Sequence, residues 1–176
     1  MRLLTNVCFD GLISGMLLKE LEFIDDCMIV DIQELINGYM EVTTDDILVN
    51  VPYVEGCGLW FCAKKSNDVI PSTYRGACYT AASSARIIFE FYGGEERFPN
   101  FVEPLRVLEK VRSTLVAEEI TENTKSWREI GKYMNGENEL YSQTRQNRVP
   151  KMMKEIIMNY GFLDAPKILE YIEDHY

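Results

Sequence analysis

The chain has 176 residues and a mass of 20.4 kDa, enough for one domain that buries about 70% of its extended surface. Hydrophobic residues make up 47% of it and charged residues 26%, with a mean hydropathy of −0.15, which excludes disordered, collagen-like and membrane-spanning chains. The formal net charge of −10 and the pI near 4.7 argue against general attraction to nucleic acid or to an anionic membrane.

Histidine and cysteine usage limits the chemistry further. The single histidine, His175, is next to the last residue, so a histidine-rich metal site is excluded and a catalytic imidazole would have to come from the chain end. The five cysteines are an odd number, and the first residues form too short an apolar run for a signal peptide. We therefore expect free thiols and a cytoplasmic location.

The first half of the chain alternates between strand-like and helix-like segments. Residues 3–7 predict a strand, Asp10 and Gly11 a turn, and residues 12–21 a helix with an apolar face. Three further apolar runs are typical of buried parallel strands: 27–30, 47–49 and 59–61.

The second half has almost wholly helical periodicity, beginning at Ala81. Pro104 fits the first turn of a helix, Ser126 and Glu129 fit a capping box ahead of another, and Pro166 predicts the start of the last one. We find no repeat and no linker. The sequence thus predicts a single α/β domain, residues 1–176, with a mostly parallel sheet of about four to five strands flanked by helices and a helical C-terminal half.

Ligands of such sheets bind beyond the carboxyl ends of the strands. The segments that follow the predicted strands are residues 8–11, 50–53 and 62–65. We expect these three segments to converge on one crevice.

These segments resemble the DHH phosphoesterase superfamily, in particular its exopolyphosphatase-related branch. Residues 3–11 are similar to the family's opening motif, His-x-Asp-x-Asp-Gly; residues 50–61 resemble the run into the Asp-His-His triplet, and residues 82–88 the helix after it. The resemblance implies hydrolysis of phosphodiester or phosphoanhydride bonds with two metal ions, Mn²⁺ or Mg²⁺. The family's smaller C-terminal substrate domain is expected to be absent, because the glycine pair at 93–94 is followed by glutamate instead of a histidine-ending motif.

The chain departs from the family at the metal-ligand positions. Asparagine, cysteine and aspartate occupy the opening motif, a second asparagine replaces the next aspartate, the triplet reads Cys-Ala-Lys, and an arginine matches the aspartate of a later helix. The positions that the resemblance assigns to this vestigial site are Asn6, Cys8, Asp10, Asn50, Cys62, Ala63, Lys64 and Arg112. Two-metal hydrolysis needs several hard ligands, and Lys64 and Arg112 would place positive charge where cations bind. We therefore predict no metal, no cofactor and no hydrolysis.

Several interpretations of individual residues stay open. Arg112 occupies the apolar stripe of its helix, where it would pair with a carboxylate such as Asp10 or join Lys64 and Lys65 in a metal-free anion site. Asp10 itself is expected to cap the helix that follows it.

The cysteines allow two interpretations. Cys8 and Cys62 are either small fillers of a collapsed pocket or members of a disulfide or a soft-metal site with Cys57.

Two functions compete for a non-catalytic degenerate domain of this kind. One is a metal-free receptor for a phosphorylated small molecule, such as a nucleotide. The other is an interaction module for a protein partner or a second copy. The alternative to both is an active metal-dependent phosphoesterase. No membrane or nucleic-acid partner is expected.

Overall fold

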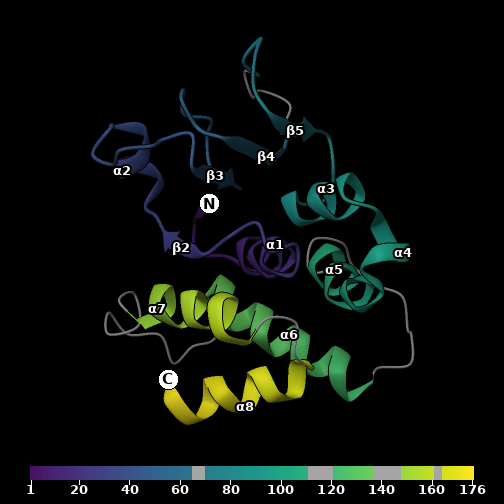
Figure 1. The fold of residues 1–176 in the computed structure, drawn as a ribbon. Helices are drawn as coiled ribbons and strands as arrows, with labels where there is room; N and C mark the ends of the chain where they lie inside the picture. The colour runs from purple at the N-terminus through teal and green to yellow at the C-terminus, as the bar shows by residue number, and fades with distance from the viewer. Residues whose placement is uncertain (65–69, 111–120, 137–147, 161–163) are drawn as a thin grey trace.

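A five-stranded sheet forms the centre of the computed structural model, which describes residues 1–64, 70–110, 121–136, 148–160 and 164–176 (Figure 1). All neighbouring strands are parallel, in the order β2-β1-β3-β4-β5. The strands are β1 (Arg2–Thr5), β2 (Asp26–Ile29), β3 (Asp46–Val49), β4 (Leu59–Ala63) and β5 (Gly76–Tyr79). The predicted parallel α/β fold is confirmed, and β5 is a strand that the apolar pattern did not indicate.

Helices follow the strands and then dominate the second half of the chain. The first group comprises α1 (Phe9–Glu20), α2 (Ile32–Ile36), α3 (Ser84–Phe91), α4 (Gly94–Arg97) and the 3-10 turn η1 (Pro99–Phe101). The second group comprises α5 (Val102–Lys110), α6 (Glu122–Asn135), α7 (Arg148–Glu155), the π-helical turn η3 (Ile156–Tyr160) and α8 (Ala165–His175). The helical C-terminal half is therefore also confirmed.

The sheet separates two hydrophobic clusters, because successive strand residues point to opposite faces. Leu3, Ile47 and Phe61 belong to the larger cluster, to which α1, α3 and the C-terminal helices contribute. Leu4 and Trp60 belong to the smaller one, which includes Leu35 of α2. In Figure 1, α1 lies between the sheet and the layer formed by α6, α7 and α8, whereas α2 lies apart from these helices.

The helix starts confirm two sequence predictions and correct two others. Pro104 and Pro166 lie in the first turns of α5 and α8. The predicted capping box is wrong: Thr121 caps α6, and Ser126 lies inside that helix, where its hydroxyl donates to the carbonyl of Glu122. The cap of α1 is Cys8 and not Asp10.

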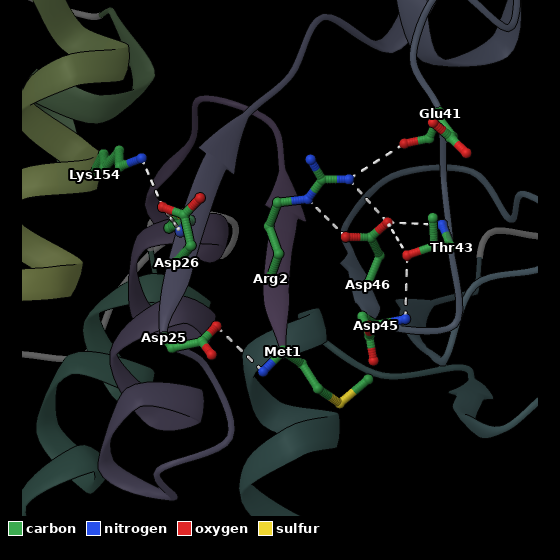
Figure 2. Close-up of polar contacts among 10 residues, drawn as sticks. Met1, Arg2, Asp25, Asp26, Glu41, Thr43, Asp45, Asp46 and Lys154 are labelled. Carbon is green, nitrogen blue, oxygen red and sulfur yellow. Dashed lines mark hydrogen bonds and ion pairs between the residues drawn. The ribbon is translucent and has the colours of Figure 1, made fainter.

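Charged groups tie together the amino ends of the strands (Figure 2). Arg2 on β1 donates from Nε to Asp46 Oδ1 at 2.7 Å and from Nη2 to Oδ2 at 2.9 Å, which joins β1 to β3. Lys154 of α7 pairs with Asp26 of β2 at 2.7 Å. This end of the sheet is thus braced by ion pairs, while the carboxyl ends carry a different kind of polar cluster.

None of the described helices is both long enough and apolar enough to cross a membrane.

Candidate functional site

Asn6, Cys8 and Asn50 meet at the carboxyl ends of β1 and β3. The order β2-β1-β3 makes this the point where successive connections leave the sheet in opposite directions, the usual ligand position in open parallel sheets. The Asn50 side-chain amide donates from Nδ2 to Asn6 Oδ1 at 3.0 Å and to Cys8 Sγ at 2.9 Å. We call these three residues the switch-point cluster.

The backbone at Asn50 explains how its amide reaches across from β3. Its φ is 57°, in the left-handed region that asparagine adopts more readily than most residues. Its own N–H donates to the Phe61 carbonyl at 3.2 Å, so the turn remains attached to β4.

Cys8 is the N-cap residue of α1, a position that serine or aspartate more often occupies. Its backbone is extended, with φ −169° and ψ 165°, and Sγ accepts the N–H of Gly11 at 3.1 Å. The thiol also donates to Asn6 Oδ1 at 3.4 Å. The sulfur therefore both starts α1 and links the two asparagines of the cluster.

Asp10 lies in the first turn of α1, yet its carboxylate accepts hydrogen bonds from the start of another helix, α3. Oδ1 accepts the backbone N–H of Ala85 at 2.8 Å and Oδ2 that of Ser84 at 3.0 Å. Ser14 donates to Oδ1 at 3.5 Å. Asp10 is only 2% exposed, so this carboxylate is buried at the positive end of α3. The expectation that Asp10 caps its own helix is wrong.

Ala63 ends β4, and Lys64 follows it, beside the same helix start. The N–H of Ala63 donates to Ser84 Oγ at 3.2 Å, and the N–H of Lys64 donates to the Tyr79 carbonyl at 2.9 Å. Ser84 thus touches both the end of β4 and Asp10. The Ala63 methyl group supplies no ligand atom, and the Lys64 side chain is half-buried.

Cys62 lies in different surroundings from Cys8. It packs against the smaller hydrophobic cluster, in register with Cys78 of β5, whereas Cys8 joins the asparagines. None of the five cysteines forms a disulfide in this structure, so the disulfide interpretation is not supported. No cluster of three potential metal ligands occurs in the part of the chain that the structure describes.

Two other cysteines are poorly suited to nucleophilic chemistry. Burial raises the pKa of the Cys27 thiol to about 12 and also raises the pKa of Cys57. Because the thiolate is the nucleophilic form, neither residue is poised to react at neutral pH.

Lys65 and Arg112 lie outside the described residues. The predicted pairing of Arg112 with Asp10, and the predicted anion site of Lys64, Lys65 and Arg112, therefore stay predictions. The structure does bring together Asn6, Cys8 and Asn50, and separately Asp10, Ala63 and Ser84. Sequence reasoning did not single out Ser84; the serine pair before a helical run was the available signal.

No protein-family model matches the sequence, and no curated protein matches it. Among solved structures, the fold is similar to that of the pGpG-specific phosphodiesterase PggH from Vibrio cholerae, with a TM-score of 0.65 and 25% sequence identity. The match covers 99% of this chain and 60% of the other. The chain therefore has a DHH-like phosphoesterase fold and spans about three fifths of the length of that enzyme.

Proposed function

We propose that this chain is a DHH-like phosphoesterase-fold domain that binds a phosphorylated nucleotide without hydrolysing it. The observation that carries this proposal is the switch-point cluster. Amide and thiol groups bonded to one another occupy positions where the family resemblance implies imidazole and carboxylate ligands.

The cluster is poorly suited to two divalent cations. Two-metal hydrolysis requires hard ligands that hold the ions about 3.5–4 Å apart. The Asn50 amide directs N–H groups toward Asn6 and Cys8, and an N–H group offers a cation no lone pair. The Asp10 carboxylate is engaged by two backbone N–H groups of α3.

The ligand class follows from the edge of the sheet and from the structural neighbour. Lys64 directly follows β4 at the same edge of the sheet as the cluster, and fixed cations bind phosphate without metal. PggH is described as specific for pGpG, a linear dinucleotide with a terminal phosphate. This nucleotide is therefore the first ligand to test on the present chain.

Calorimetric titration with pGpG, with and without Mn²⁺, tests the proposal. We expect binding that does not require Mn²⁺ and that weakens about fivefold or more in Lys64→Ala, because one charged phosphate contact is lost. Lys132→Ala is the matched control, since Lys132 is exposed on α6 and pairs only locally with Glu129.

Chromatography of the same mixtures tests for hydrolysis. Unchanged pGpG after prolonged incubation with Mn²⁺ agrees with the proposal. Release of GMP that depends on Mn²⁺ would establish the active phosphoesterase instead. Absence of pGpG binding by the folded protein would remove the receptor function.

A further inference from the structure

A groove between α5 and the start of α6 is lined, within the part of the chain that the structure describes, by residues other than those of the sequence-predicted site. Its volume is about 560 Å³, within the range of pockets that hold small molecules. The helical segment that precedes α5 contributes Glu95 and Pro99 to its wall.

The two helices present matching stripes to the groove. Glu103, Arg106 and Lys110 follow one another at spacings of three and four on α5. Thr121, Thr124 and Arg128 have the same spacings on the cap and first turns of α6. Residues at these spacings lie on one helix face, so α5 places one acidic and two basic residues in the groove, and α6 places two threonines and one arginine there.

The Glu103 carboxylate accepts hydrogen bonds from uncharged side chains at the start of α6. The donors are the hydroxyls of Thr121, at 3.1 Å, and Thr124, and the side-chain amide of Asn123. Burial acts to raise the pKa of Glu103, but these hydrogen bonds and the nearby charge of Arg106 outweigh it, and the pKa is lowered. The carboxylate is therefore ionised and held by α6.

Arg106 and Arg128 form no hydrogen-bonded ion pair with a carboxylate among the described residues, although the charge of Arg106 acts on the nearby Glu103 and helps to lower its pKa. Neither side chain forms a hydrogen bond or an ion pair with any residue within the described ranges. Arg106 is exposed and Arg128 is half-buried. In a chain with a net charge of −10, two such guanidinium groups at one groove make a local excess of hydrogen-bond donors for an anion.

We propose that this groove binds a small phosphate monoester, whose phosphate group is held by Arg106 and Arg128. The planar guanidinium group matches phosphate geometry and forms two parallel charge-assisted hydrogen bonds. Pro99, Val102 and Val107 provide an apolar wall for the body of the ligand. The carboxylates of Glu95 and Glu103 favour a ligand whose remaining part carries hydroxyl or amino groups, and they disfavour a ligand with a second anionic group.

Calorimetric titration of the full chain with AMP and with inorganic phosphate, in about 150 mM salt so that long-range attraction is screened, tests this proposal. We expect Arg106→Gln and Arg128→Gln each to weaken binding about fivefold or more. Arg75→Gln removes the same charge from an exposed site just before β5 and should leave binding unchanged. Equal affinity for both probes would identify phosphate alone as the ligand, and tighter AMP binding would identify a monoester.

Nuclear magnetic resonance separates this site from the one at the sheet. The side-chain Nε–Hε signals of Arg106 and Arg128 should shift on titration with AMP, and should still shift in Lys64→Ala. Absence of these shifts, or equal affinity in wild type and both arginine variants, would overturn the proposal whatever the result with pGpG.

Discussion

The carboxylate of Asp10 accepts the backbone N–H of Ala85 at 2.8 Å, across 75 positions of sequence. A second bond, to the N–H of Ser84, makes the contact bidentate. The buried Asp10 carboxylate of α1 thus accepts hydrogen bonds from two backbone N–H groups at the start of α3, where N–H groups lack partners within the helix. Its charge also interacts favourably with the dipole of that helix. The aspartate that the resemblance matches to a metal motif therefore has a structural task in this chain.

Replacing Asp10 tests this task. Asp10→Asn should lower the free energy of unfolding by about 2 kcal/mol, because the amide loses the charge and turns an N–H group toward a backbone donor. Urea denaturation followed by circular dichroism measures the loss. Asp174→Asn, at an exposed position of α8, is the control, and equal midpoints for both variants would contradict the assignment.

Cys8 gives a second prediction, since its sulfur caps α1 and accepts from Asn50. Cys8→Ala should cost about 1 kcal/mol of unfolding free energy, the usual effect of losing an N-cap side chain. Cys8→Ser retains a side-chain acceptor and should recover most of this loss. Thermal unfolding of the three proteins makes the comparison. An alanine variant as stable as the serine variant would show that the sulfur does not act as a cap.

The fold was predictable where the sequence carries a local signal. The apolar runs at 27–30, 47–49 and 59–61 each contain most of a strand. In β3, which is buried along its whole length, the apolar run reflects burial on both faces. The strand Gly76–Tyr79 has no such run. It is an edge strand that exists through its pairing with β4, and that pairing is not a property of its own residues.

The candidate site was also predictable only in part. The rule that ligands bind beyond the carboxyl ends of strands selected the segments that contain Cys8 and Asn50, whose side chains are in contact, whereas Asn6 was singled out only by the family resemblance. The partner of Asp10 could not be found in this way, because its contact with Ala85 depends on how α1 packs against α3. Local capping preference gave the wrong helix for this carboxylate.

The buried carboxylate of Asp46 gives a prediction about pH (Figure 2). Burial acts to raise its pKa, but hydrogen bonds from Arg2 and Thr43 outweigh burial and the pKa is lowered. The unfolded chain, with an aspartate pKa near 3.9, therefore takes up a proton at higher pH than the folded protein. The stability that Asp46 contributes is complete above about pH 5 and is lost as the pH falls through the folded-state pKa.

Comparison with Asp46→Asn isolates this contribution. The variant should be about 2 kcal/mol less stable than wild type at pH 7, since it weakens a buried pair with Arg2. The difference should shrink toward pH 3 as the wild-type carboxylate is protonated. Urea midpoints from pH 3 to pH 7 measure it, with exposed Asp45→Asn as the control. A difference independent of pH would mean that the charge of Asp46 is not what stabilises the fold.

A substitution at Gly11 tests how closely the backbone is packed in the turn after β1. A Cβ atom at Gly11 would lie 2.7 Å from the carbonyl oxygen of Asn6 and 2.7 Å from Thr5 Oγ1. The first contact is with backbone, so relief requires moving the turn that also delivers the Gly11 N–H to Cys8. Gly11→Ala should therefore lower the unfolding free energy by about 2 kcal/mol or more.

Gly131→Ala is the matched change in another buried helix glycine. Its Cβ would meet the ring of Phe9 at 3.2 Å, a tight contact that a small ring movement relieves. The gain in helix propensity, about 1 kcal/mol, offsets this strain, so the urea midpoint should change little. Equal losses of stability in the two variants would mean that general crowding, and not the close approach of the Gly11 and Asn6 backbones, is what excludes a larger residue at Gly11. A loss confined to Gly11→Ala would tie the start of α1 to the position of Asn6, and so to the geometry of the switch-point cluster.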